Sequence, residues 1–152
     1  MTQEEKELLF KDLCARLPYK VKINCFDVPR TLETISIDYD GFVTINCGGE
    51  HFYHPLSNIL HKDCLPYLRP MSSMTEEENE ELFEICTLYT NDGDASTYEY
   101  WGVEILHHSR YGMGFENNYS AIDWLNSHHF DYRGLIEKGL ALEAPEEMYS
   151  TK

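Results

Sequence analysis

The stretch that decides the fold runs from residue 19 to residue 54 and reads YKVKINCFDVPRTLETISIDYDGFVTINCGGEHFYH. Its first segment, Tyr19 to Cys25, alternates apolar and polar residues, which is the period of a half-buried β-strand. Three similar segments follow, TLETISI at 31–37, FVTINC at 42–47 and HFYH at 51–54, and turn-forming residues separate them. The stretch therefore predicts four or five short antiparallel strands. A strongly bent sheet of this length closes most easily into a small SH3-like or Sm-like β-barrel.

A helix is predicted before the sheet. Thr2 and Glu5 have the spacing of a capping box, in which each side chain accepts a hydrogen bond from a free backbone N–H at the helix start. We expect the helix to run from about Gln3 to Arg16 and Pro18 to end it.

The residues after the sheet are expected to form a mixed annex. Two prolines in CLPYLRPMSSM (64–74) exclude a helix or a central strand, so this segment crosses away from the sheet. Helices are predicted to begin at Thr75, where Glu78 completes a second capping box, and at Ser120. The β-branched and aromatic residues of YEYWGVEILHH (98–108) favour a strand.

These elements predict an α+β fold in one compact unit. Residues 1–66 would contain the N-terminal helix and the small antiparallel β-barrel, and residues 67–152 would form a C-terminal helical and mixed annex packed on it. With 152 residues, of which 42% are hydrophobic, the chain has enough apolar material for a packed core.

The chain is strongly acidic. Its 27 Asp and Glu residues against 12 Lys and Arg give a formal net charge of −15. Such a surface repels a phosphate backbone, so direct binding to nucleic acid is not expected. The same charge suits an acidic mimic that occupies a nucleic-acid site on a host enzyme, and this alternative stays open.

The sequence favours a cytoplasmic protein without a membrane partner. The first residues, TQEEKELLFKDLCARL, carry charges throughout and predict neither a signal peptide nor a membrane span. The cysteines are odd in number and scattered, which fits free buried thiols in a reducing compartment better than a disulfide framework. They are Cys14, Cys25, Cys47, Cys64 and Cys86.

One stretch offers candidate metal ligands. HFYHPLSNILHKDC places His51, His54, His61 and Cys64 as two pairs, and four such ligands can close a tetrahedral structural site. The strand period opposes this interpretation, because residues three apart in a strand lie on opposite faces. We therefore expect these residues on the rim of the barrel, with no metal or cofactor bound. A metal-dependent enzyme with a His and Cys site is the less favoured alternative.

The paired histidines of SHHFDYRGLIEKGLALEAP (127–145) present a choice between an active site and a packed tail. Adjacent side chains point in different directions, so one metal rarely uses both His128 and His129. Asp131 and Arg133 indicate a local cap of a short helical turn and an ion pair. Because every feature has a structural use, the packed tail is favoured and no catalytic residue is assigned.

Two stretches resemble a known family. They are YLRPMSSMTEEE at Tyr67–Glu78 and WLNSHHFDYRGLIEKGLALEAPEEMY at Trp124–Tyr149. They are similar to a family of small uncharacterised proteins from phages and prophages of gut Bacteroides-type bacteria, which carry PYLRPMSSMTEEE in mid-chain and end in HFDYRGLI..GLALEAP. The resemblance implies a phage or prophage origin and a bacterial cytoplasm. It implies no reaction, cofactor or catalytic residue.

These observations favour a non-enzymatic protein–protein interaction module that binds an unidentified host or phage protein. Trp101 and Tyr111, aromatic residues in the turn-rich and divergent middle of the chain, are the candidate partner surface. An acidic anti-defence inhibitor that mimics nucleic acid is the alternative.

Overall fold

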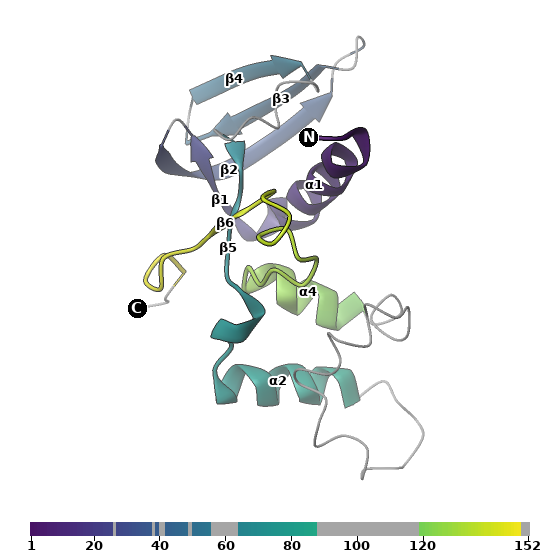
Figure 1. Cartoon of the computed structure of the whole chain (residues 1–152), viewed down its shortest axis with the longest axis vertical. Helices are drawn as coiled ribbons and strands as arrows, with labels where there is room; N and C mark the ends of the chain where they lie inside the picture. The colour runs from purple at the N-terminus through teal and green to yellow at the C-terminus, as the bar shows by residue number, and fades with distance from the viewer. Residues whose placement is uncertain are drawn as a thin grey trace.

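The computed structural model describes residues 1–25, 27–37, 39, 42–48, 50–55, 64–87 and 119–149, with the backbone alone for 42–43, 50–55 and 86–87. In chain order the elements are α1 (Gln3–Arg16), η1 (Leu17–Tyr19), β1 (Lys22–Cys25), β2 (Val28–Ile37), β3 (Phe42–Cys47), β4 (Glu50–Pro55), β5 (Tyr67–Leu68), η3 (Met71–Ser73), α2 (Glu76–Thr87), α4 (Tyr119–Ser127) and β6 (Leu142–Glu143). The sheet lies at one end, α2 at the other, and α4 between them (Figure 1). The predicted α+β class with an N-terminal helix is confirmed. None of the described helices has the length and apolar character to cross a membrane.

The main sheet is an open antiparallel meander with the order β1-β2-β3-β4. In the described residues β1 and β4 are its two edges and do not pair with each other, so the predicted SH3-like or Sm-like barrel is not confirmed. The register of β2 and β3 shifts between Leu32 and Thr34. β2 also begins at Val28, inside the segment predicted as a turn, because Cys25 pairs directly with Val28 in the first hairpin.

The outer edge of β1 is covered by the crossing segment. The backbone N–H of Asn24 donates to the carbonyl of Leu65 at 2.8 Å, and Ile23 forms an antiparallel bridge with Pro66. This pairing takes up hydrogen-bonding groups of β1 that barrel closure would need. It also explains why Asn24, predicted on the polar face, is only 6% exposed.

The first predicted strand is shorter than expected at its start. Tyr19 belongs to η1 rather than to the sheet, and β1 begins at Lys22. Pro18 lies in the first turn of η1, where its missing N–H has no cost. The proline therefore prolongs the helical conformation past Arg16 instead of ending it abruptly.

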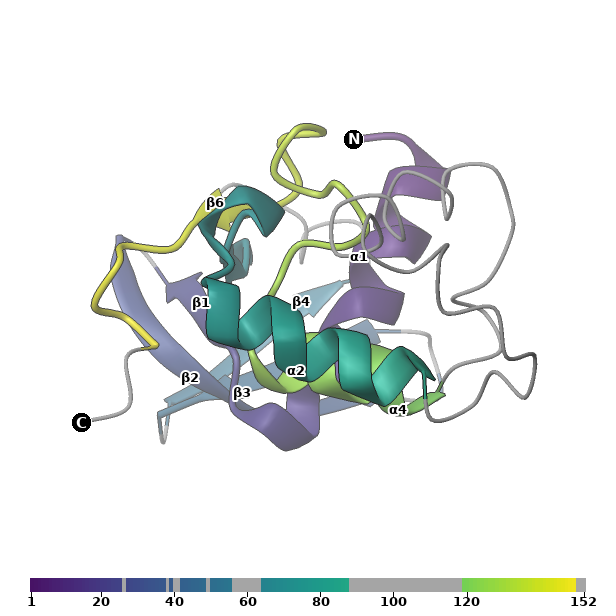
Figure 2. The same cartoon turned by 90° about the horizontal axis from the view of Figure 1, so that it is seen from below.

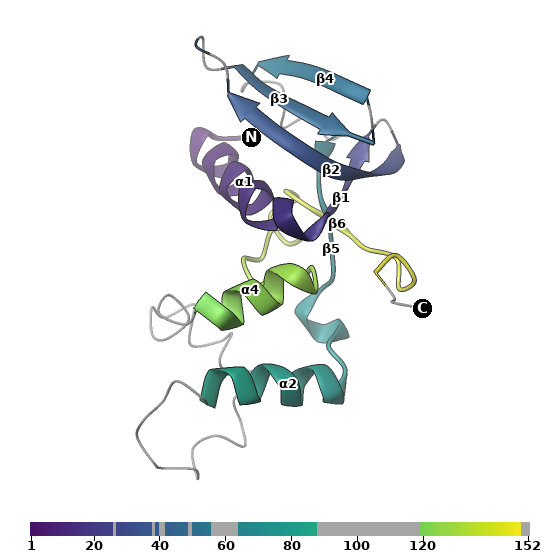
Figure 3. The same cartoon turned by 180° about the vertical axis from the view of Figure 1, so that it is seen from behind.

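α1 covers one face of the sheet (Figure 3), and its Leu9 and Leu13 are buried in the core between them. The predicted capping box is confirmed, since the N–H of Glu5 donates to Thr2 Oγ1 at 3.2 Å and the N–H of Thr2 donates to Glu5 Oε2 at 2.7 Å. The core cluster also includes residues from the end of the chain. Its buried members are Leu9, Leu13, Val21, Ile23, Cys25, Leu32, Ile45, Cys47, Leu65, Leu68, Leu135, Leu140 and Ala141. A domain boundary between residues 66 and 67 stays a prediction.

α2 and α4 lie side by side and enclose a second, smaller core (Figure 2). Its buried members are Leu82, Ala121, Trp124, Leu125 and Phe130. The second capping box is confirmed, because the N–H of Thr75 donates to Glu78 Oε2 at 2.9 Å and the N–H of Glu78 donates to Thr75 Oγ1 at 3.2 Å. The third helix starts at Tyr119, so Ser120 lies inside it rather than before it. The strand predicted at 98–108 lies outside the described residues.

Residues 66–69 connect the two cores by pairing on both sides. On one side, the N–H of Leu142 donates to the Pro66 carbonyl at 2.8 Å and β5 pairs in parallel with β6. On the other side, the N–H of Arg69 donates to the His129 carbonyl at 2.8 Å, and Arg69 bridges to Phe130. Through these pairings residues 129–131 and residues 142–144 both lie beside residues 66–69.

Candidate functional site

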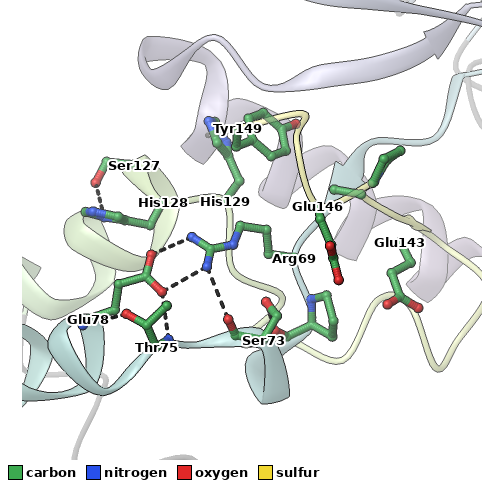
Figure 4. Close-up of a pocket in the computed structure, with 13 residues that line it drawn as sticks. Arg69, Ser73, Thr75, Glu78, Ser127, His128, His129, Glu143, Glu146 and Tyr149 are labelled. Carbon is green, nitrogen blue, oxygen red and sulfur yellow. Dashed lines mark hydrogen bonds and ion pairs between the residues drawn. The ribbon is translucent and has the colours of Figure 1, made fainter. Parts of the chain in front are cut away.

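A pocket opens beside this doubly paired segment (Figure 4). Its volume is about 820 Å³, and its walls come from residues 69–78 and residues 127–149. These are parts of the two stretches that carry the resemblance to the phage family. Segments that lie far apart in the sequence thus form one concave site.

Arg69 lies at the base of the pocket and is fixed by Glu78 (Figure 4). The guanidinium donates from Nη1 to Glu78 Oε1 at 2.7 Å and from Nη2 to Oε2 at 2.9 Å. Its Cζ atom also lies 4.1 Å from the centroid of the Phe130 ring, a cation–π contact. The hydrogen bonds from Arg69 hold the pKa of the Glu78 carboxyl below its usual range, so both groups are charged near neutral pH.

His128 is held by the end of α4. Its Nδ1 lies 2.9 Å from the carbonyl of Trp124 and 3.1 Å from Ser127 Oγ. A carbonyl only accepts hydrogen bonds, so Nδ1 carries a hydrogen in this contact and donates it. The ring stacks on Trp124 with centroids 4.0 Å apart.

His129 occupies a different environment from its neighbour. Its backbone is left-handed, with φ +60°, and the residue is only 6% exposed. The ring stacks on Tyr149 with centroids 3.9 Å apart, and Nδ1 is buried with no hydrogen-bond partner in the described part of the chain. Burial, and next the positive charge of Arg16, lower the pKa of His129 to about 4, so the imidazole is neutral near pH 7.

Tyr149 fastens the residues after β6 to the rest of the molecule. Its hydroxyl donates to the Tyr67 carbonyl at 2.8 Å and accepts from the Lys22 N–H at 2.9 Å. Burial raises the pKa of this phenol well above its ordinary value, so it stays protonated. One side chain thereby joins the end of the described chain to β1 and β5.

The carboxylates of Glu143 and Glu146 form the side of the pocket away from His128 (Figure 4). Both residues are exposed. Among the described residues of the lining, Glu78 and these two are the acidic side chains, and Arg69 is the one Arg or Lys. With the histidines counted as neutral, the lining has an excess of negative charge.

The hydroxyls in the pocket are engaged in internal hydrogen bonds. Ser127 Oγ donates to the Trp124 carbonyl at 2.8 Å, and Ser73 Oγ donates to the Pro70 carbonyl at 2.8 Å. A hydroxyl that donates to a carbonyl does not offer its proton to a histidine base, as nucleophilic catalysis requires.

The structure places the candidate metal ligands only in part. His51 and His54 are in β4, where they pair with Asn46 and Val43, but their side chains and the whole of His61 lie outside the described residues. Cys64 is 3% exposed. Within the described residues no group of three His, Cys, Asp or Glu side chains is arranged to hold a metal ion. The four-residue metal set stays an untested and less favoured alternative. The partner surface at Trp101 and Tyr111 stays a prediction, because both residues lie outside the described ones.

The cysteine prediction holds for three described residues and fails for one. Cys25, Cys47 and Cys64 are buried thiols that form no disulfide, whereas Cys14, also outside any disulfide, is exposed on α1. The sulfur atoms of Cys25 and Cys47 lie 3.7 Å apart in the core of the sheet. Burial, and next the neighbouring Cys25, raise the pKa of the Cys47 thiol, which makes it a poor nucleophile.

The tail prediction is confirmed in its cap and wrong in its ion pair. Asp131 accepts hydrogen bonds from the N–H groups of Leu135 and Ile136, both at 2.8 Å, although the residues that follow form turns rather than a helix. Arg133 pairs instead with Asp12 of α1, at 3.6 Å between Nη1 and Oδ1. The Asp131 carboxylate is used by the backbone, so the arginine finds a partner in another element.

The sequence did not single out Arg69 or Tyr149. For Arg69 a signal exists, since it is the charged residue of the otherwise apolar segment LPYLRP. Tyr149 has no local signal, because its partners Tyr67 and Lys22 lie 82 and 127 residues away. Comparisons with protein-family models, curated proteins and solved structures gave no match for this chain.

Proposed function

We propose that this protein is a non-enzymatic interaction module of phage or prophage origin, which works in the cytoplasm of a bacterial host. It holds a segment of one host or phage protein in the pocket between residues 69–78 and 127–149. The observation that carries the proposal is the pocket itself, formed by the two stretches that resemble the phage family.

The size and rigidity of the pocket support this role. A volume of about 820 Å³ lies within the range of pockets that hold drug-sized ligands, and it accommodates more than one side chain of a peptide. Arg69, His128 and Tyr149 are each fixed by at least two contacts. Fixed walls reduce the ordering cost of binding, which favours recognition of an extended segment.

The test compares two tryptophan substitutions in η3. Ser73 is exposed and lines the pocket, so Ser73→Trp should fill it; Ser72 is the exposed neighbour outside the lining, so Ser72→Trp is the matched control. The tagged protein and both variants are used to capture partners from host lysate, with and without nuclease, followed by mass spectrometry. We expect one protein to be retained by the wild type and by Ser72→Trp and lost with Ser73→Trp, regardless of nuclease. Equal retention by all three would place the binding elsewhere, and no specific retention by the wild type would overturn the proposed function.

A second candidate is an acidic inhibitor that occupies a nucleic-acid site on a host enzyme. The observation that favours it is the row of exposed glutamates along α2, in which Glu76, Glu80 and Glu84 follow at four-residue intervals. Like charges at this spacing destabilise a helix. Binding of the row to a basic nucleic-acid site on a host enzyme would give these glutamates a role despite that destabilisation. This candidate predicts that duplex DNA competes with the captured partner and that Glu76→Gln with Glu80→Gln weakens capture. Capture unaffected by both would exclude it.

A further inference from the structure

The backbone carbonyls of the segment that crosses from β1 to the second core face two sides in alternation. The Leu65 carbonyl faces β1 and accepts from the Asn24 N–H at 2.8 Å. The next carbonyl, that of Pro66, faces the opposite way and accepts from the Leu142 N–H at 2.8 Å. Carbonyls two residues apart in an extended chain face the same side, so the Tyr67 carbonyl faces β1 again.

The pairing of β1 with this segment stops one bond early. In an antiparallel ladder the hydrogen-bonded pairs recur at every second residue of each strand. Here the Asn24 N–H donates to the Leu65 carbonyl. The next bond in this register would run from the N–H of Lys22 to the carbonyl of Tyr67. Within the described chain the pairing ends instead at the bridge formed by Ile23, and no bridge joins Lys22 to Tyr67.

The hydroxyl of Tyr149 occupies the place of this missing bond. It accepts from the Lys22 N–H at 2.9 Å and donates to the Tyr67 carbonyl at 2.8 Å. A donor and an acceptor that could bond each other directly are thus both bonded to one inserted oxygen, as when a water molecule bridges two strands. The Tyr149 side chain therefore acts as a wedge between β1 and β5.

The wedged arrangement has a cost at His129. The Tyr149 ring stacks on the imidazole with centroids 3.9 Å apart (Figure 4), and Nδ1 of the imidazole is buried with no partner among the described residues. A buried polar atom without a hydrogen bond destabilises the state that contains it. Withdrawal of the ring would uncover the imidazole to water and would let the Lys22 N–H bond the Tyr67 carbonyl directly. Both gains offset part of the loss of the hydroxyl bonds and the ring contact.

We propose that residues 145–149 are a strap with two positions, and that Tyr149 is the wedge of the closed position. In the closed position the Tyr149 ring forms a wall of the pocket and interrupts the ladder between β1 and β5. In the open position β1 and β5 pair through one more hydrogen bond, and the pocket loses that wall. Residues 145–147 are exposed, so their movement uncovers little apolar surface. The strap goes beyond the proposed function, because it does not depend on what the pocket binds.

The experiment measures scalar couplings across hydrogen bonds by NMR on the isotope-labelled full chain. A coupling between the amide nitrogen of Lys22 and the carbonyl carbon of Tyr67 reports the direct bond. The coupling between Asn24 and Leu65, whose bond is present, is the internal control. We expect the wild type to show the control coupling and not the Lys22–Tyr67 coupling. A Lys22–Tyr67 coupling in the wild type would mean that Tyr149 separates nothing and would overturn the proposal.

Two substitutions at Tyr149 distinguish a wedge from a simple anchor. Tyr149→Phe keeps the ring in the gap but leaves both backbone groups without a partner, so hydrogen exchange of the Lys22 amide should be about tenfold faster than in the wild type. Tyr149→Ala removes the ring as well, so the ladder should close. The Lys22–Tyr67 coupling should then appear, and the Lys22 amide should exchange more slowly than in Tyr149→Phe. An anchor predicts the opposite order, because alanine removes more contacts, and that order without the coupling would overturn the strap.

The controls keep the two positions of the strap distinct from unfolding. Tyr119→Ala, at a position 78% exposed on α4, should leave the Lys22 exchange unchanged. The Leu32 amide, which donates to the Val21 carbonyl, reports whether each variant is folded. If Tyr149→Ala does not fold, Tyr149→Leu replaces it, since leucine covers His129 but is too short to reach between the strands. The wild-type couplings decide the wedge in either case, and the proposed function is decided separately by Ser73→Trp.

Discussion

His129 combines a left-handed backbone, a nearly complete burial and an unpartnered Nδ1. Such conformations cost free energy and persist only where the surroundings impose them. Here the surroundings are the Arg69 N–H, which donates to the His129 carbonyl, and the Tyr149 ring, which stacks on the imidazole. The strain is located at the pocket, and neither the backbone conformation nor the stacking could be predicted from the letters HH.

The burial of His129 predicts a loss of stability in mild acid. An unfolded histidine titrates near pH 6.5, and the folded pKa of His129 is about 4. As the pH falls below about 6.5, the unfolded state binds a proton that the folded state refuses. The free energy of unfolding should therefore decrease by roughly 3 kcal/mol between pH 6.5 and 4, and no contribution from this group is lost above pH 6.5.

Urea unfolding at several pH values measures this dependence. The control is His129→Asn, because asparagine tolerates the left-handed backbone but does not titrate. The variant should lose the slope between pH 6.5 and 4. The carboxyl of Glu78, whose pKa is lowered, begins to lose its own contribution as the pH falls through about 4.5, so it adds acid sensitivity at the lower end of this range in both proteins. An unchanged slope in the variant would mean that the imidazole is not held neutral by its burial.

Tyr149→Phe tests the hydroxyl that joins β1 and β5. The substitution keeps the ring on His129 but leaves the Lys22 N–H and the Tyr67 carbonyl without their partner. We expect the free energy of unfolding to fall by about 1–3 kcal/mol in denaturant titrations. Tyr119→Phe, at a position 78% exposed, should change it by less than about 0.5 kcal/mol. If Tyr149→Phe leaves the free energy of unfolding unchanged, the two hydrogen bonds of the hydroxyl add nothing to stability.

At the scale of elements, α1 is tied to the residues after α4 by a fully buried charge. Arg16 and Asp12 both have 0% exposure, and Arg16 Nε donates to Asp12 Oδ2 at 2.7 Å. Arg16 Nη2 donates further to the Phe130 carbonyl at 2.8 Å. Buried pairs of this kind position elements more reliably than they add stability, because desolvation offsets their attraction.

Substitutions at Asp12 and Arg16 compare the loss of one charged partner with the loss of both, by their effects on the free energy of unfolding. Asp12→Ala leaves a buried guanidinium without its carboxylate and should lower the free energy of unfolding by about 3–5 kcal/mol. Asp12→Leu combined with Arg16→Met removes both charges and should recover most of that loss. Thermal unfolding of the two variants makes the comparison. If the double variant is as unstable as Asp12→Ala, the attraction between Asp12 and Arg16 itself stabilises the fold, beyond the mere avoidance of an unpaired buried charge.

The elements that the sequence predicted correctly have local causes. The helix at Gln3–Arg16 and the helix after Thr75 each begin with a capping box, which joins residues three apart in the sequence. The strands of the meander follow from the alternation of apolar and polar residues and from the turn-forming residues between them. The open sheet was not predictable in this way, because it depends on residues 64–66 taking the edge of β1. The pocket was missed for the same reason, since it arises where residues 66–69 pair with two later segments.

At the scale of the whole molecule, the net charge of −15 should make stability depend on salt. Folding brings like charges closer together, and salt screens their repulsion over distances near 10 Å. The free energy of unfolding should therefore rise when sodium chloride is added, as measured by urea titration. Glu80→Gln, which removes two like-charge contacts along α2, should add roughly 0.5 kcal/mol at low salt and less at high salt. A fall in stability with salt would point to dominant attractive pairs instead.

The sheet core described above is completed by Leu135, Leu140 and Ala141, which the ribosome makes long after β3 ends at Cys47. At synthesis rates of about 5–20 residues per second, the interval of roughly 90 residues lasts on the order of 4–18 s. During that time the nascent sheet and α1 have an apolar face without its final cover. We therefore expect the nascent sheet to expose this apolar face until the end of the chain has been made, and exposed apolar surface of this kind is what chaperones bind.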